Sequence, residues 1–195
     1  MNEPARAPLA PEVRAKGRRT LLLLAVVAIA PVIASYSAYY FFPREQRTNY
    51  GELLTTAPAP PLSGTRADGQ PFALAQLHGK WALIVSAPGG CDALCAQALH
   101  ATRQARTIQG REMERVQRVW LVTDLSTPDP ALLAQHPDLL VARVTREALA
   151  GLPAGAERIY VIDPLGNLVL AFPSDPDIKR AAKDIERLLR ASRIG

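Results

Sequence analysis

The chain has 195 residues, so that about 150 remain for a soluble domain once an apolar N-terminal segment is set aside, which is the common size of a single core. Its formal net charge of +5 at pH 7 would suit a nucleic-acid-binding protein. We exclude that class because the domain is expected outside the cytoplasm, and because several arginines fall in helix-like segments, where a solvated helical face is the usual explanation. These arginines are Arg103, Arg106, Arg111 and Arg115.

The N-terminal segment predicts a membrane anchor. Residues 21–42 form a run of 22 without a charge, long enough to cross the hydrocarbon core as one helix. Because basic residues stand directly before this run, the positive-inside rule predicts residues 1–20 as a cytoplasmic tail and places everything after the helix outside the cytoplasm. These basic residues are Arg14, Lys16, Arg18 and Arg19.

A cleaved signal peptide is the alternative to an anchor, with residues 34–38 as the cleavage region. The apolar stretch is longer than the usual hydrophobic region of a signal peptide, about 7–15 residues, and this favours an uncleaved helix. The sequence therefore predicts a single-pass protein of a bacterial inner membrane, with its C-terminal domain in the periplasm.

Residues 43–62 are predicted to be a linker, because Ala57-Pro58-Ala59-Pro60-Pro61 favours an extended, polyproline-like spacer. The folded domain would then comprise residues 63–195. Its first feature is the pair Asp68-Gly69, which predicts a tight turn between two short strands.

The rest of the domain alternates predicted strands and helices. Residues 81–87 form a continuous apolar run, which suits a strand buried on both faces, and Pro88-Gly89-Gly90 ends it. A helix is expected over residues 91–108. Further strands are predicted at 116–122, 139–144, 159–162 and 167–172, and further helices at 130–135 and 177–192. This alternation predicts an α/β sandwich with a mixed sheet.

The last predicted helix is amphipathic and rich in basic residues. Attraction of this segment to anionic lipid headgroups is a minor possibility that its composition raises. The basic residues are Lys179, Arg180, Lys183, Arg187, Arg190 and Arg193.

Cys91 and Cys95 are the only two cysteines of the chain, and they lie where the first central strand meets its helix. If the helix begins at Cys91, both residues lie on one face with Cα atoms about 6 Å apart, within disulfide range. A helix N-terminus lowers the pKa of a thiol, and the thiolate is the form that attacks disulfides and binds soft metals. Two buried hydrophobic cysteines, or a structural staple, are the alternatives.

The order of these elements resembles the thioredoxin-like fold, and several motifs are similar to the Sco/SenC proteins within it. The Cys-x-x-x-Cys spacing, the anchor and the segment Leu74-x-x-Leu77-x-Gly79-Lys80-Trp81 carry the resemblance, together with the sequences around Asp124 and Asp163. Sco/SenC proteins are membrane-anchored and help to build the copper centres of cytochrome c oxidase. The resemblance implies a thioredoxin-like sandwich over residues 60–190, with Cys91 and Cys95 as copper ligands.

The chain departs from the Sco/SenC pattern at the third copper ligand. The family's histidine would fall near Gly155, where the sequence has none, and Ala96 stands where a proline usually follows the second cysteine. His78, His100 and His136 are the histidines present, and each is interpreted first as an ordinary surface or packing residue. Whether His100 or His136 replaces the missing ligand stays open.

Without an imidazole ligand, two thiolates can still hold Cu(I), which accepts low coordination, whereas Cu(II) should bind poorly. Two neighbouring thiols can also carry out thiol–disulfide exchange. The first hypothesis is therefore an assembly factor that serves respiratory oxidase subunits, or exchanges copper with other chaperones, through Cys91 and Cys95. The alternatives are a general periplasmic thiol–disulfide oxidoreductase and a non-catalytic interaction domain with a structural disulfide.

Overall fold

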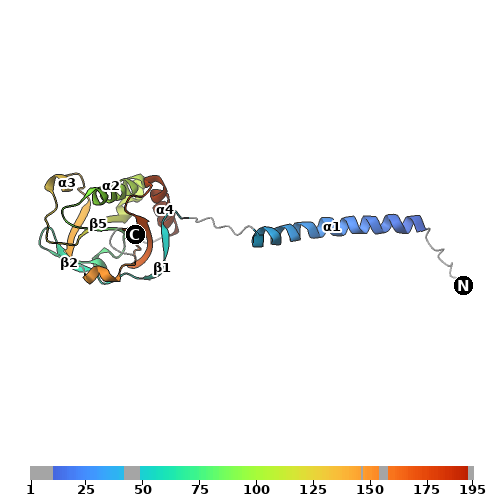
Figure 1. The fold of residues 1–195 in the computed structure, drawn as a ribbon, viewed down its shortest axis with the longest axis horizontal. Helices are drawn as coiled ribbons and strands as arrows, with labels where there is room; N and C mark the ends of the chain where they lie inside the picture. The colour runs from blue at the N-terminus through green and yellow to red at the C-terminus, as the bar shows by residue number, and fades with distance from the viewer. Residues whose placement is uncertain (1–10, 42–48, 146, 154–157, 193–195) are drawn as a thin grey trace. The chain divides into compact units, whose positions relative to one another are not determined.

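The computed structural model describes residues 11–41, 49–145, 147–153 and 158–192, and it divides the chain into an N-terminal unit and a folded domain that begins at Thr48. The N-terminal unit contains one long helix, α1 (Pro11–Phe41), with Pro31 inside it (Figure 1). Its stretch Arg18–Ser37 is long and apolar enough to cross a membrane, by length and composition. The expected N-terminal apolar helix is therefore confirmed.

The folded domain is built on one mixed sheet of eight strands, in the order β1-β8-β7-β4-β5-β6-β2-β3. The strands β4, β5 and β6 are parallel, and the pairs β4–β7, β7–β8 and β1–β8 are antiparallel. The strands are β1 (Glu52–Pro58), β2 (Ser63–Arg66), β3 (Pro71–Ala73), β4 (Trp81–Ala87), β5 (Val116–Val122), β6 (Leu139–Val144), β7 (Arg158–Ile162) and β8 (Asn167–Pro173).

Two helices cover one face of the sheet. These are α2 (Ala93–Ile108) and α4 (Ile178–Ala191), which lie side by side (Figure 1). The smaller helices are α3 (Pro130–Ala134) and the 3-10 turns η1 (Leu74–Leu77), η2 (Gly110–Arg115) and η3 (Glu147–Gly151). The mixed sheet and its helices confirm the predicted α/β sandwich of thioredoxin-like type.

The central strand β4 is buried along its whole length because it has a core on each side. Trp81, Leu83 and Val85 pack with α2 and α4, whereas Ala82 and Ile84 face the opposite core. Successive side chains of a strand point to opposite faces, so a continuous apolar run is what such a position requires. The second core also contains Phe72 of β3 and two residues from loops, Leu62 and Leu152.

The predicted linker was wrong over residues 52–58, which form β1. This strand pairs with β8, from Glu52 opposite Ala171 to Pro58 opposite Asn167. Most of its side chains are exposed, so the segment has no apolar pattern of its own. Its backbone hydrogen bonds to β8 hold it at the edge of the sheet, a position where proline is tolerated.

Candidate functional site

Cys91 and Cys95 are joined by a disulfide bond, with their Cα atoms 5.1 Å apart. They lie beyond the carboxyl end of β4, where the loop from Pro88 leads into α2. The expectation that the two cysteine side chains lie within bonding distance at this strand-to-helix junction is therefore confirmed.

The expected placement of both cysteines on one helical face was wrong, because α2 begins after Cys91. Asp92 is the N-cap residue, and its Oδ1 accepts a hydrogen bond from the Cys95 backbone N–H at 2.9 Å. Cys91 has a φ of 39°, and it is the one non-glycine residue of the described segments with a positive φ. Its N–H donates to the carbonyl of Pro88 at 3.1 Å. A turn, rather than a helical repeat, brings Cys91 to the first turn of α2.

The two sulfurs differ in access. Cys95 lies in the first turn of α2 and is only 4% exposed, packed in the core between the sheet and the helices. Cys91 is only partly buried. A partner molecule in solution would therefore reach Cys91 before Cys95.

The loop before Cys91 is held by the loop that follows β5. The Gly89 N–H donates to Asp124 Oδ1 at 2.8 Å, and the Gly90 N–H donates to Ser126 Oγ at 2.9 Å. The hydrogen bond from Gly89, followed by that from the Ser126 hydroxyl, lowers the pKa of Asp124. A side chain at Gly89 would lie 2.3 Å from the carbonyl oxygen of Ser126, so this position requires glycine.

A cleft of about 310 Å³ lies beside the disulfide, between the end of β4 and the start of α2. Cys95 and Asp92 line it from the α2 side, and Arg158 lines it from the start of β7. Arg158 also forms an ion pair with Glu52 of β1. The cleft therefore brings a cation to the neighbourhood of a cysteine sulfur.

Sequence reasoning missed Arg158 as a residue of the site. Its position follows from the pairing of β7 with β4, in which Ile159 lies opposite Val85. Once β4 and β7 are known to be antiparallel neighbours, the first residue of β7 must fall at the cysteine end of β4. In the sequence, only the hairpin predicted at Asp163 indicated that the strand beginning near Arg158 is antiparallel to a neighbour.

His136 lies at the amino ends of the parallel strands, whereas the cysteines lie beyond the carboxyl end of β4. It precedes β6, and it is buried with its Nδ1 3.3 Å from the guanidinium of Arg118. Arg118 pairs with Leu83, four residues before the end of β4. At the usual rise of a strand, Leu83 is about 13 Å from the end of β4, where the loop to the cysteines begins. In this arrangement His136 is a packing residue.

His78 and His100 also do not form a common site with the two cysteine sulfurs. A side chain at Gly166 would meet the His78 ring, which puts His78 beside the turn between β7 and β8. His100 is exposed on α2. Gly155, where the resemblance expects a histidine, lies outside the described residues. Among the residues that the structure describes, no group of three His, Cys, Asp or Glu side chains could hold a metal ion.

Comparison with known proteins supports the fold. A family model described as "Transmembrane-like, thioredoxin-like, C-terminal domain" matches residues 81–192, more than half of the chain. No curated protein matches the sequence.

Several solved structures are similar to the domain. Yeast Sco1 has a TM-score of 0.59 at 20% identity, covering 69% of this chain and 97% of its own. Copper-bound ScoI of Bradyrhizobium japonicum has a TM-score of 0.53 at 20% identity, covering 67% and 99%. The thioredoxin domain of a thiol-disulfide oxidoreductase from Bacteroides vulgatus has a TM-score of 0.55 at 18% identity, covering 70% and 99%. The expected likeness to Sco/SenC proteins is thus confirmed for the fold.

Proposed function

This chain belongs to the transmembrane-like, thioredoxin-like C-terminal domain family, and we propose that it is a membrane-anchored thiol–disulfide exchange factor that assists the assembly of copper sites in cytochrome c oxidase. The observation that carries the proposal is the Cys91–Cys95 disulfide at the mouth of α2, with one accessible and one buried sulfur. Cys91 and Cys95 are the catalytic residues in this proposal.

Cys91 is the attacking residue. As a thiolate it attacks one sulfur of a client disulfide, forming a mixed disulfide while the other client sulfur leaves as a thiolate. Cys95 then attacks the Cys91 sulfur, which releases the client as a dithiol and forms the bond seen in the structure. The client gains two electrons and two protons, and a dithiol donor must reduce Cys91 and Cys95 again.

The surroundings suit these two roles. The unpaired N–H groups at the start of α2 favour a thiolate there, and Arg158 adds a positive charge to the same cleft. The carboxylate of the N-cap Asp92 acts in the opposite direction. Because Cys95 is only 4% exposed and Cys91 is half-buried, the resolving role suits Cys95 and the attacking role suits Cys91.

Copper enters this proposal as cargo. Two thiolates suit Cu(I), a soft ion that accepts two ligands, once the disulfide has been reduced. Among the described residues no histidine lies beside them and no group of three His, Cys, Asp or Glu side chains could hold a metal ion, so we expect Cu(II) to bind weakly. Cys91 and Cys95 would be the residues that hold Cu(I).

The client and the place of action follow from the resemblance to Sco/SenC proteins and from the apolar helix. Respiratory oxidase subunits carry the thiols that a copper site needs in reduced form, and other copper chaperones are the second class of partner. The domain boundaries expected from the sequence, a tail over 1–20 and an anchor over 21–42, complete the proposal of a periplasmic domain on a single-pass inner-membrane anchor.

The deciding experiment is the copper content of the oxidase in cells that carry Cys91→Ser, with the melting temperature of the purified variant measured in parallel. We expect a loss of oxidase copper with a folded domain, because the core comes from β4, β5, β7 and β8. Normal copper loading in cells with Cys91→Ser would rule out the assembly role.

A general periplasmic thiol–disulfide oxidoreductase is the second candidate function. The likeness to the Bacteroides oxidoreductase domain favours it, as does the lack of a three-residue metal site among the described residues. In that case Cys91→Ser would leave oxidase copper unchanged while the purified protein with both cysteines reduces a mixed set of disulfide substrates.

A further inference from the structure

Charge is unevenly divided over the folded domain. The neighbouring helices α2, η2 and α4 carry nine Lys and Arg residues against four Asp and Glu residues. The rest of the chain from residue 48 onward carries seven Lys and Arg against eleven Asp and Glu. The helical layer is therefore positive and the remainder negative, although the domain as a whole is close to neutral.

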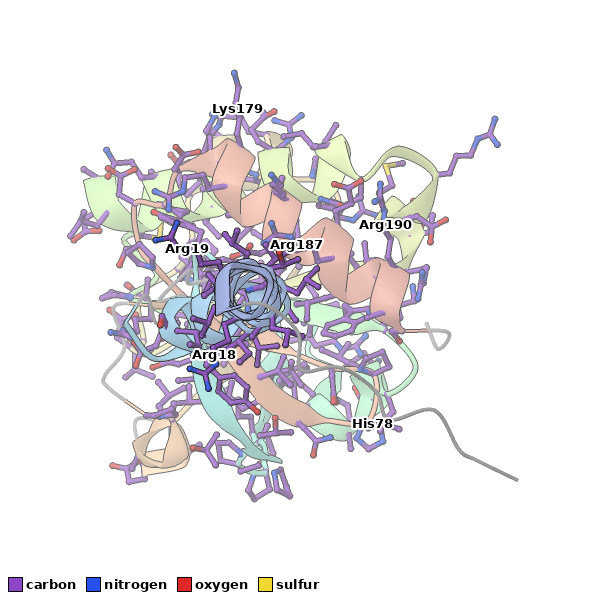
Figure 2. The ribbon with its side chains drawn as sticks, turned by 90° about the vertical axis from the view of Figure 1, so that its right-hand side faces the viewer. Arg18, Arg19, His78, Lys179, Arg187 and Arg190 are labelled. Atoms are coloured by element: carbon purple, nitrogen blue, oxygen red, sulfur yellow. A yellow bond between two sulfur atoms is a disulfide. The ribbon has the colours of Figure 1, made fainter. Side chains whose placement is uncertain are left out.

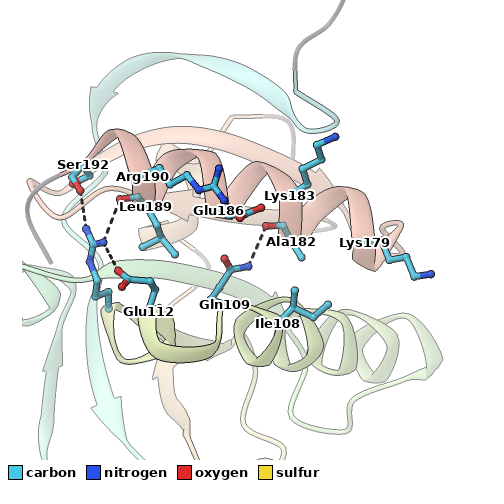
Figure 3. A pocket seen from close by; sticks show the side chains of 11 residues that line it. Ile108, Gln109, Glu112, Lys179, Ala182, Lys183, Glu186, Leu189, Arg190 and Ser192 are labelled. Carbon is cyan, nitrogen blue, oxygen red and sulfur yellow. Dashed lines mark hydrogen bonds and ion pairs between the residues drawn. The ribbon is translucent and has the colours of Figure 1, made fainter.

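The positive charge is concentrated on the outer side of α4. Lys179, Lys183 and Arg190 recur at helical spacing, so they share one face. Figure 2 labels Lys179 and Arg190 on α4, and Figure 3 labels all three. Arg190 forms an ion pair with Glu186 at 2.5 Å. Within the described part of the chain, Lys179 and Lys183 take part in no ion pair, and both are exposed. Two lysine charges on this face are thus available to an outside partner.

A groove of about 800 Å³ runs between this face and the end of α2 (Figure 3). Ile108 lines it and is 56% exposed. Four cations and two carboxylates, Glu112 and Glu186, line the groove with it, so the groove keeps a positive balance that would attract an anionic lipid surface.

The chain enters the domain against α4. The backbone N–H groups of Tyr50 and Gly51 both donate to Asp184 Oδ2, at 2.6 and 2.8 Å. The Tyr50 hydroxyl accepts a hydrogen bond from the Asp177 N–H at 3.0 Å, and the Arg180 guanidinium lies 4.4 Å from the centre of the Tyr50 ring. The first residues of the domain are therefore held by the helix that carries the basic face.

The tether between α1 and this contact is short. Only seven residues separate Phe41 from the first described residue of the domain. Even a fully extended chain of that length spans at most about 30 Å. If α1 crosses a membrane, the length of this segment limits residue 49 to within about 30 Å of the end of α1.

We propose that the basic face of α4, formed by Lys179, Lys183 and Arg190 together with Ile108, docks on anionic phospholipid headgroups of the membrane that holds α1. Cations within about a Debye length of an anionic surface are attracted to it, and the short tether raises how often the domain meets the membrane that holds α1. The inference rests on the proposed anchor but not on the chemistry of the cysteines. Lipid is favoured over an acidic protein because the expected anchor already supplies a membrane.

The test is lysine acetylation of the full chain in nanodiscs, read by mass spectrometry. Discs of phosphatidylcholine alone are compared with discs that also contain phosphatidylglycerol. We expect Lys179 and Lys183 to react about fivefold more slowly in the anionic discs, and high salt to remove the difference. Lys80, an exposed lysine outside the helical layer, should react equally in both.

Equal acetylation of Lys179 and Lys183 in the two discs would overturn the proposal, and so would equal protection of Lys80. The double variant Lys183→Glu, Arg190→Glu should lose the protection of Lys179, whereas Lys80→Glu should keep it. A thermal melt of each variant separates lost docking from lost folding. An intact mass below that of the full chain would show that the N-terminal segment is cleaved, and would contradict the anchor rather than the docking. Vesicles of phosphatidylglycerol added to the shorter chain would then test docking by itself.

Discussion

Asp124 and Gly89, which are 35 residues apart, are joined by a hydrogen bond from the Gly89 N–H to Asp124 Oδ1. Asp124 also accepts hydrogen bonds from the N–H and the hydroxyl of Ser126. Through these contacts the loop after β5 holds the turn that presents Cys91. The position of the Cys91 sulfur therefore depends on Asp124, which follows β5 and lies on the far side of α2 in the sequence.

Replacing Asp124 with Ala should loosen the turn before Cys91 and change the reactivity of the disulfide. We expect dithiothreitol to reduce the Cys91–Cys95 bond several-fold faster in Asp124→Ala, with little change in the overall fold. Asp129→Ala is the matched control, because Asp129 also accepts a backbone hydrogen bond, from Ala131, but at the start of α3. Equal reduction rates in the wild type and Asp124→Ala would contradict the role given to Asp124.

Gly89 and Gly90 offer a neighbouring pair with opposite expectations. A methyl group at Gly89 would lie 2.3 Å from the Ser126 carbonyl oxygen, whereas one at Gly90 would have no neighbour within 4 Å. We expect Gly89→Ala to lower the free energy of unfolding by about 1–3 kcal/mol, since the backbone must move, and Gly90→Ala to leave it nearly unchanged. Urea denaturation measures both. A similar loss in the two variants would argue against steric contact as the cause.

His136 should make the stability of the domain depend on pH. Burial, and then the charge of Arg118, lower the pKa of His136 from its ordinary value of 6.5. Arg103 and His100 of α2 act in the same direction, and Asp138 acts against them. Because the folded protein keeps this ring neutral, its contribution to stability is complete above pH 6.5 and is lost progressively as the pH falls towards the lowered value.

Urea denaturation as a function of pH measures this effect. His136→Gln keeps a hydrogen-bond acceptor for the Arg118 guanidinium but cannot be protonated, so it should remove most of the decline below pH 6.5. His100→Gln, at an exposed position on α2, is the control and should leave the decline in place. An unchanged pH profile in His136→Gln would show that another group is responsible.

Arg158 should favour the thiolate of the reduced cysteine pair. It lines the cleft that Cys95 also lines, and its charge is shared with Glu52. We expect Arg158→Gln to raise the pKa of the Cys95 thiol, the cysteine that lines this cleft, and to slow its alkylation by iodoacetamide at neutral pH, and Glu52→Gln to do the reverse. The pH dependence of the alkylation rate reports both. Arg66→Gln, on β2 at the far side of the sheet, should have no effect.

The reduced protein should bind one Cu(I) ion and should bind Cu(II) far more weakly. Two thiolates satisfy Cu(I), but Cu(II) needs further nitrogen or oxygen ligands, and His78, His100 and His136 all lie away from the pair. Competition with a coloured Cu(I) chelator, followed by titration with Cu(II), measures the two affinities. Tight, coloured Cu(II) binding would show that a histidine moves to the cysteines.

The sequence alone determined the elements whose pattern is local. The apolar run at residues 81–87 predicts a strand buried on both faces, and β4 has these bounds, because burial on both sides leaves no place for polar side chains. The uncharged N-terminal run predicts a long apolar helix for a similar reason, because a helix that is apolar on all sides shows an unbroken apolar sequence. The two cysteines at the junction after β4 were evident as a pair from their spacing.

Only the tertiary structure decided which of these elements meet. Residues 52–58 are exposed and contain proline, so nothing local marks them as a strand, and pairing with β8 creates β1. Asp124 and Arg158 reach the cysteine site through the loop after β5 and through the pairing of β7 with β4. The parallel register of β5 and β6 places His136, just before β6, at the amino ends of these strands and away from the cysteines. Contacts of this kind depend on strand order, and strand order is set by the burial of whole elements rather than by the residues at the contact.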